Sequence, residues 1–253
     1  MKCSTPARSS ARAPTRNSIW STSASSARKP KTLSFAQAAA LPLTSITAWE
    51  LLFDRLGAVP GKSVDPRTLL IIGGAGGVGS ILIQLARRLT GLTVVATATR
   101  PESQKWCLDL GAHAVIDHCK ADEGADREAE SAAGRPRREP HLHRPALQGD
   151  RRLHRAAGQV RIDRRSPEFN VSAFKGKAVS IHWESMFTRS SFQTPDMIAQ
   201  HHLLNDVADL IDKGVLRTTL DQTFGTINAA NLKRAHALLR VGKSRGKIVL
   251  EGW

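Results

Sequence analysis

The sequence predicts an α/β protein with a doubly wound parallel sheet, and two observations carry this prediction. Short apolar runs alternate with segments of helical periodicity, and one of these runs leads directly into a glycine-rich turn. Strands buried on both faces of a parallel sheet are continuous apolar runs, and strands that alternate with helices are typical of right-handed crossover units. At 253 residues the chain can form one large domain of this kind or two small ones.

The central unit is expected between residues 67 and 118. Its elements, in order, are a doubly buried strand at 67–74, a helix at 80–89, a strand at 93–98, a helix from Pro101 and a strand at 111–118. Each strand is a short apolar run, and each helix carries apolar residues three and four positions apart. This order predicts a Rossmann-like sheet.

Further elements are expected on both sides of the central unit. They are a short helix at 33–40, a loop from Leu41 into a second apolar helix, a turn at Pro60–Gly61, a strand at 178–186, a helix from Thr194 to Lys213, a strand at 218–224, a helix at 228–241 and a strand at 247–250. Thr194 is the expected N-cap, because Pro195 and Asp196 suit a first helical turn. Gly214 and Gly242 are the expected helix stops.

Two segments show neither the period of a strand nor that of a helix. Residues 1–30 are rich in Ser and Arg and contain no acid, which predicts a disordered leader, with an organelle transit peptide as the alternative. Residues 120–166 hold eleven Arg and only scattered apolar residues, so no strand or helix is expected there. We hypothesise that residues 1 to about 28 and about 120–166 are out-of-frame translations, because a GC-rich gene read in another frame yields such a composition. A natural disordered insertion is the alternative. The folded domain is therefore expected at 31–253, interrupted by 120–166.

Composition excludes several classes of protein. No apolar run approaches the roughly 18 residues of a membrane span, and the absence of Tyr removes mechanisms with a phenolic proton donor. Three cysteines cannot build a disulfide framework, which favours a reduced, cytoplasmic location. The net charge of +15 suggests a nucleic-acid partner, but residues 31–119 hold eight bases against six acids and 170–253 hold eleven against seven. No nucleic-acid or membrane partner is expected, whereas a homodimer stays open.

The glycine turn is the strongest functional signal. Gly74, Gly76 and Gly79 form a G-x-G-x-x-G pattern between a buried strand and an apolar helix, which is the context of a dinucleotide-binding turn. Gly74 is expected to permit the tight turn, Gly76 and Gly77 to let a pyrophosphate approach, and Gly79 to let the helix pack on the sheet. The helix N-terminus then faces the phosphates.

The end of the second strand indicates which dinucleotide binds. NAD-binding folds carry an acid there for the ribose 2′-hydroxyl, but this chain has Thr99 and Arg100. A hydroxyl and a guanidinium suit a 2′-phosphate, so NADP(H) is expected, with Thr99, Arg100 and Ser103 as contacts. The alternative is that Arg100 is a solvated surface residue.

Five further motifs stand out along the chain, namely AAALPLTSITAWE, IIGGAGGVGSILIQLAR, LGAHAVIDH, HWESMFTRS and RGKIVLEGW. Together they resemble the medium-chain dehydrogenase/reductase superfamily, and most of all its zinc-type alcohol dehydrogenase-like and quinone oxidoreductase branch. The resemblance covers about 31–119 and 167–253. It implies NADPH-dependent hydride transfer to a quinone or an activated carbonyl or alkene.

The same resemblance places the cofactor contacts. Thr47 would lie near the nicotinamide, the backbone from Gly76 through Val78 to Gly79 would hold the pyrophosphate, and Gly246 with Lys247 would border the cleft. No catalytic residue is assigned by this comparison. Glu184 either faces the cleft or ends an edge strand.

The chain also departs from that family. Members begin with a large barrel-like domain that forms half of the substrate cleft, and residues 1–30 do not resemble it. We therefore expect weak or no turnover, with a non-catalytic dinucleotide-binding module as the alternative. His113, His118 and Cys119 are the remaining neighbours of metal-ligand type, and zinc is not expected because adjacent strand residues point to opposite faces.

Overall fold

The computed structural model describes residues 2–3, 26–61, 63, 65–117, 159–162, 172, 175–176, 178–242 and 244–252. Most of the segments 1–30 and 120–166 lies outside these residues. Of their described parts, β1 (Lys2–Cys3) pairs antiparallel with β2 (Ala27–Arg28).

The strand β6 (Gln159–Ile162) corrects the prediction that no strand occurs in 120–166. It pairs in parallel with β7 (Ser180–Trp183), a strand that the sequence predicted. Four residues are too few to show a hydrophobic period, whereas the ladder with β7 satisfies the backbone groups of both segments.

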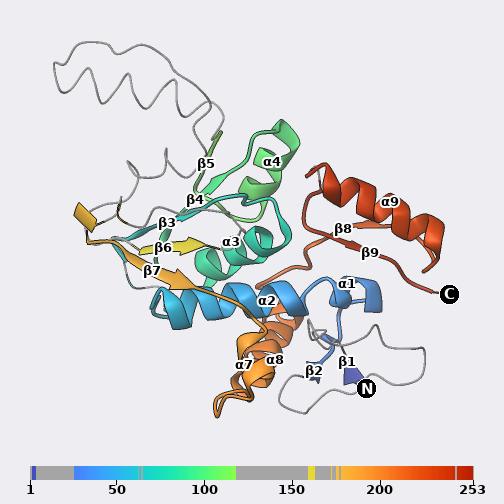
Figure 1. Cartoon of the computed structure of the whole chain (residues 1–253), viewed down its shortest axis with the longest axis horizontal. Helices are drawn as coiled ribbons and strands as arrows, with labels where there is room; N and C mark the ends of the chain where they lie inside the picture. Colours follow the sequence, from blue (N-terminus) through green and yellow to red (C-terminus); the bar gives the residue numbers. More distant parts are fainter. Residues whose placement is uncertain are drawn as a thin grey trace.

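Three parallel strands form the central sheet, with β4 (Thr93–Thr97) between β3 (Thr68–Ile71) and β5 (Ala114–Ile116). Helix α3 (Gly77–Leu89) connects β3 to β4, and α4 (Pro101–Asp109) connects β4 to β5 (Figure 1). The predicted alternation is confirmed. Helix α3 begins three residues earlier than predicted, because the last glycines of the turn already have helical geometry.

The strand β3 is less buried than predicted. Val94 and Ala96 of β4 are fully buried, but Ile71 is the one buried residue of β3 and Thr68 is exposed. The prediction of a strand buried on both faces is therefore wrong for β3. Among the described strands it forms an edge of the sheet, where it has a neighbour on one side.

The helices before the sheet follow one another with almost no loop. Helix α1 (Phe35–Ala39) begins with a capping box between Ser34 and Gln37. Helix α2 (Pro42–Trp49) follows at once and continues as a π-helical segment, η2 (Glu50–Arg55). The loop predicted from Leu41 is reduced to that residue, because the fixed φ of Pro42 suits the first helical turn.

The predicted start of the next long helix is wrong. A short helix, α7 (Thr188–Phe192), precedes it, and α8 (Ala199–Asp212) begins five residues after Thr194. The Thr194 hydroxyl donates to Asp196 Oδ1 at 2.6 Å instead of accepting a backbone N–H bond. The helix ends as predicted, before Gly214 at φ +69°.

The last elements agree with the sequence. Strands β8 (Leu220–Thr223) and β9 (Lys247–Val249) pair in parallel, and α9 (Ala229–Arg240) lies between them in the chain. The Asn228 side chain caps α9 by accepting the Asn231 N–H bond at 2.8 Å. Gly242, at φ +63°, follows its end.

The main core lies between the sheet and α2, α3 and α4. In Figure 1, α2 runs between α3 and α8, and residues of α2 contact both helices. Ile81, Ile83 and Leu85 of α3 are fully buried there, together with Leu52 of η2. This packing places α2 beside the start of α3.

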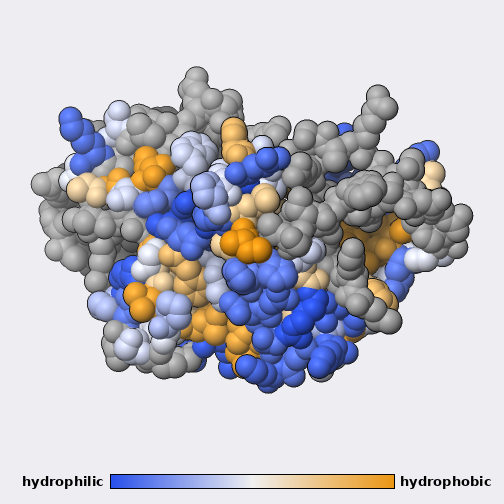
Figure 2. Space-filling view, turned by 90° about the horizontal axis from the view of Figure 1, so that it is seen from below, coloured by the Kyte–Doolittle hydropathy of each residue, from blue (hydrophilic) through white to orange (hydrophobic). Residues whose placement is uncertain are grey.

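Figure 2 shows one face of the molecule, on which separate apolar areas alternate with hydrophilic ones. None of the helices in the described ranges combines the length and the apolar character that crossing a bilayer requires.

Candidate functional site

The glycine turn lies at the carboxyl end of β3, where ligands of open parallel sheets bind. It is tied to the neighbouring strand by two bonds: the Gly73 N–H donates to Thr97 Oγ1 and the Gly74 N–H donates to the Thr97 carbonyl, both at 3.0 Å. The residue with left-handed backbone is Gly73, at φ +68°. The tight turn therefore depends on Gly73, one residue before the glycine predicted for it.

Two of the predicted glycines are required by close packing. A Cβ atom on Gly79 would lie 2.7 Å from Gly74 Cα, so the first turn of α3 touches the backbone that leaves β3. A Cβ atom on Gly74 would lie 2.7 Å from Ala96 Cβ of β4. Gly79 thus has the helix–sheet contact predicted for it, whereas Gly74 serves packing instead of turn geometry.

The first turn of α3 contains backbone N–H groups that have no acceptor within the helix. Gly76 is the N-cap residue and provides no side-chain cap, and the first bond within the helix runs from the Ser80 N–H to the Gly76 carbonyl at 2.8 Å. The N–H groups of Gly77, Val78 and Gly79 therefore have no acceptor inside the helix. Together with the positive end of the helix dipole they can bind an anion.

Helix α2 forms one side of this turn. The Thr44 methyl carbon would be 3.2 Å from a Cβ atom on Gly77, so the two helices meet where α3 begins. Thr47 lies one turn further along α2; it is 7% exposed, and its hydroxyl donates to the Leu43 carbonyl at 3.2 Å. Thr47 is thus brought to the same region, with its hydroxyl directed back along its own helix.

The start of β9 forms another side. The Gly246 N–H donates to the Ala75 carbonyl and the Lys247 N–H donates to the Thr219 carbonyl, both at 2.8 Å. Gly246 has φ +47°. Lys247 Cδ would lie 2.9 Å from a Cβ atom on Gly77. The residues that the resemblance assigned to the border of the cleft therefore lie against the glycine turn.

The Lys247 side chain is half-buried. Burial lowers the pKa of its ammonium group, and within the described part of the chain no carboxylate pairs with it. A cation is also disfavoured beside a helix N-terminus. A bound anion would relieve both effects.

Thr99, Arg100 and Ser103 lie at the carboxyl end of the neighbouring strand β4, where α4 begins. Thr99 is exposed, and Arg100, the N-cap of α4, pairs with Glu102 at 3.1 Å. Their side chains are 33% and 50% exposed, and an ion pair so exposed adds little stability. Ser103 is 4% exposed, so of the three it presents the least surface to a ligand.

Sequence reasoning missed Thr44 and Thr97, which hold the turn from two sides. Helical spacing could have indicated Thr44, which precedes Thr47 by three positions. Nothing in the sequence singles out Thr97, because its role depends on the pairing of β3 with β4.

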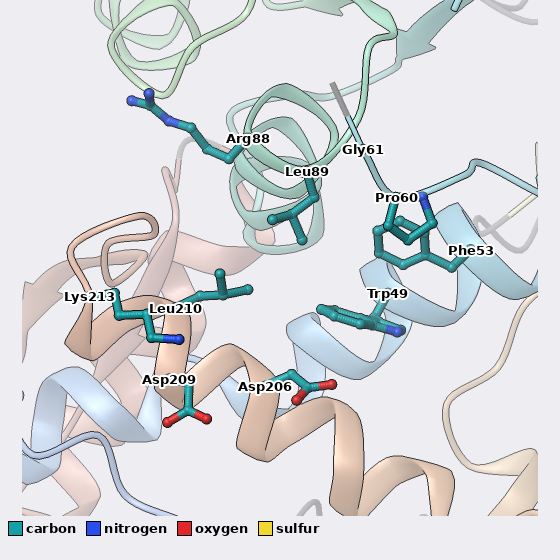
Figure 3. Close-up of a pocket in the computed structure, with 10 residues that line it drawn as sticks. All are labelled: Trp49, Phe53, Pro60, Gly61, Arg88, Leu89, Asp206, Asp209, Leu210 and Lys213. Atoms are coloured by element: carbon teal, nitrogen blue, oxygen red, sulfur yellow. The ribbon is translucent and has the colours of Figure 1, made fainter. Parts of the chain in front are cut away.

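A separate cavity of about 460 Å³ lies at the other end of α3, between that helix, η2 and α8 (Figure 3). Leu89 and Leu210 point into it, Trp49 and Phe53 line one side, and Arg88 points away. The 13 residues of α3 span about 20 Å, so this cavity is not part of the glycine-turn site.

Among the described residues, no three His, Cys, Asp or Glu side chains are gathered as metal ligands would be. His113 is exposed, and its Nδ1 atom accepts the Val94 N–H bond at 2.9 Å, so this residue is tied to the backbone of β4. His118 and Cys119 lie outside the described residues.

The fold and the turn define the class of protein. A parallel sheet with crossover helices, and a glycine turn that opens the first of them, form a Rossmann-like α/β domain.

Comparison with known proteins gives the family. A family model described as zinc-binding dehydrogenase matches residues 143–250. A zinc-type alcohol dehydrogenase-like protein of Staphylococcus aureus strain COL is 33% identical over 235 residues, which cover 88% of this chain and 67% of the relative. An NADPH-dependent alkenal/one oxidoreductase of Arabidopsis thaliana is 45% identical over 94 residues, 37% of this chain and 23% of that protein.

A solved structure agrees with these relatives. The crystal structure of a protein of Rhizobium etli described as a zinc-dependent alcohol dehydrogenase has a TM-score of 0.78 at 48% identity, and the match covers 91% of this chain and 68% of that one. The chain belongs to the medium-chain dehydrogenase/reductase superfamily, among the zinc-type alcohol dehydrogenase-like proteins. It is an oxidoreductase by resemblance to these proteins.

The family match also bears on the segment 120–166. It begins at residue 143, so the second half of this segment resembles the family. For residues 143–166 this favours translation in the family's own frame over the out-of-frame hypothesis.

Proposed function

We propose that this chain binds NADP(H) for hydride transfer to an activated carbonyl, alkene or quinone. The observation that carries the proposal is the meeting of Lys247 with the first turn of α3, where three N–H groups have no acceptor inside the helix. Two sources of positive potential at one glycine turn suit a diphosphate.

Arg100 and Thr99 support the choice of NADP(H) over NAD(H). They follow β4, the strand beside the glycine turn, and this is where an acid would bind the ribose of NAD. The exposed Glu102 carboxylate is a weak competitor for Arg100, so a 2′-phosphate could take its place. The name of the Arabidopsis relative points to the same cofactor.

When bound, NADPH supplies a hydride from its nicotinamide ring. The chain's own part is to hold and orient: the α3 turn and Lys247 position the diphosphate, and α2 presents Thr47 on the nicotinamide side. Quinones, enals and enones share an electron-poor conjugated carbonyl, so one hydride donor serves all three. No step of the proposed reaction passes through zinc.

Titration of the full chain with NADPH and with NADH tests the proposal. We expect NADPH fluorescence to rise on binding, NADH to bind more weakly, and absorbance to fall when an enone or a quinone is added. Binding without consumption would instead make the chain a non-catalytic dinucleotide-binding module. If neither NADPH nor NADH binds, the assignment of the glycine turn to the cofactor diphosphate is refuted.

A further inference from the structure

A cluster of buried charged residues joins η2 to the segment from β7 to α8, apart from the glycine turn. Glu50 Oε1 accepts bonds from Arg189 Nη1 at 2.6 Å and from Gln200 Nε2 at 3.0 Å. Glu184 Oε2 accepts a bond from Arg55 Nε at 2.9 Å. The side chains of Glu50 and Glu184 are 1% and 0% exposed, so both carboxyl groups are removed from water.

Carboxylates outnumber cations in this cluster. Arg189 also donates to Asp54 at 3.0 Å and to Asp196 at 2.9 Å. Four carboxyl groups thus face two guanidinium groups, and full ionisation would leave two uncompensated negative charges. Asp54 and Asp196 are 35% and 59% exposed and keep contact with water. The excess charge is therefore most costly at Glu50 and Glu184.

One carboxyl oxygen of the Glu50 and Glu184 pair has no hydrogen-bond partner among the described residues. Glu184 Oε1 is buried and has no hydrogen-bond partner among the residues that the structure describes. The Glu50 carboxyl group is close enough to the Glu184 side chain to interact with it electrostatically. Two ionised carboxylates repel each other there, whereas a protonated carboxyl group can donate a hydrogen bond to its neighbour.

The direction in which the pKa of Glu184 shifts agrees with this geometry. Burial raises the pKa of Glu184 to about 7, the Glu50 carboxyl group adds to the rise, and Arg55 opposes it by a smaller amount. Two carboxyl groups at one site commonly hold one proton between them.

We propose that Glu184 carries a proton that it shares with Glu50, and that this proton holds the segment after β7 against η2. Loss of the proton at alkaline pH loosens that contact. Because η2 continues α2, which carries Thr47, the contact also supports the helix beside the glycine turn. The sequence left open whether Glu184 faces the cleft or ends an edge strand. In the structure, Glu184 follows the end of β7 and its side chain faces η2.

Other titratable groups face this pair and belong in the test. They are Asp54 and Arg55 of η2, Arg189 of α7 and Asp196 before α8. His182 of β7 is added because it precedes Glu184 by two residues. His182 is the group to separate, because its Nε2 atom is buried without a partner in the described part of the chain. Gln200, from α8, is neutral.

The variant Glu184→Gln tests the proposal, because glutamine resembles the protonated acid. A carboxyl pKa that is raised on folding gives stability that is fully present below the unfolded pKa and is lost as the pH rises through the folded one. The urea midpoint of the wild type is therefore expected to fall between pH 4.5, the ordinary pKa of glutamate, and about pH 7. Glu184→Gln should lack this part of the fall, matching the wild type at pH 4.5 and exceeding it at pH 8.

The control variant is His182→Asn, which should keep the fall that Glu184→Gln removes. Parallel pH profiles for the wild type and Glu184→Gln would overturn the proposal. A second measurement needs no variant: the carboxyl carbon resonances of glutamate-labelled wild type are followed by NMR against pH. One resonance titrating near neutrality is expected, and titration of every glutamate below pH 5.5 would overturn the proposal even if Glu184→Gln fails to fold.

Discussion

The side chain of Lys247, from the last strand, lies against Gly77, the first residue of α3. A Cβ atom on Gly77 would be 2.9 Å from Lys247 Cδ. An uncompensated cation and the positive end of a helix dipole repel each other unless an anion lies between them. The contact therefore supports the proposed binding of a phosphate group at this point.

Lys247→Met keeps the aliphatic stem and removes the charge. A hydrogen bond to a charged group contributes about 1.5–3 kcal/mol, so the NADPH dissociation constant should rise about tenfold or more. Fluorescence titration at two salt concentrations measures this, and the variant should also show a weaker salt dependence. Lys233→Met, on the exposed surface of α9, is the matched control. An unchanged dissociation constant for Lys247→Met would remove Lys247 from the site.

Gly79→Ala should destabilise the protein. The new Cβ atom would meet Gly73 and Gly74 backbone atoms at 2.7 Å, and backbone yields less readily than a flexible side chain. Overpacking of this kind costs about 1–3 kcal/mol. Thermal unfolding measures the effect, with Gly176→Ala as control, because no atom of the described residues lies within 4 Å of a Cβ atom there. Equal midpoints for both variants would contradict the close contact of α3 with the end of β3.

Arg100→Ala should change which cofactor is preferred. If Arg100 binds the 2′-phosphate, the NADPH dissociation constant rises about tenfold or more while that of NADH stays unchanged. Glu102→Gln should act in the opposite direction, because it releases Arg100 from its ion pair at 3.1 Å. Arg88→Ala, at the far end of α3, controls for loss of charge alone. A parallel loss of NADPH and NADH binding would contradict the assignment.

Asp212 should stabilise the fold in a pH-dependent way. Backbone N–H bonds from Thr32 and Lys31 lower the pKa of its carboxyl group from 3.8 to about 2. A pKa that folding lowers gives stability that is present above the unfolded value and is lost as the pH falls through the folded value.

Asp212→Asn should therefore unfold at lower urea than the wild type at pH 6, and the difference should shrink between pH 4 and pH 2. Asp206→Asn, on the same helix, is the control. A difference that stays constant down to pH 2 would show that the carboxylate charge of Asp212 is not what stabilises the contact.

The sequence predicted most elements where the signal was local. The strand and helix order from β3 to β5 followed from apolar runs and the glycine turn, and the start of α9 followed from the capping residue Asn228. The predicted start of α8 was wrong. The Thr194 hydroxyl donates to Asp196 instead of capping the helix, and the same local sequence pattern is compatible with either bond.

The candidate site was predicted in part. The glycine turn before α3 could be inferred from residues 74–79, because six neighbouring positions specify its pattern. Thr97 could not be inferred, because its bond to Gly73 requires β3 to pair with β4 in one register.

By itself the sequence determined that a parallel sheet with a glycine turn would form, since apolar periodicity and the freedom of glycine act over a few neighbouring residues. Only the tertiary structure decided that Lys247 meets Gly77 and that Glu184 bonds to Arg55 of η2. Such pairs come from segments far apart in the chain, and their approach depends on how the whole core packs, which no local pattern records.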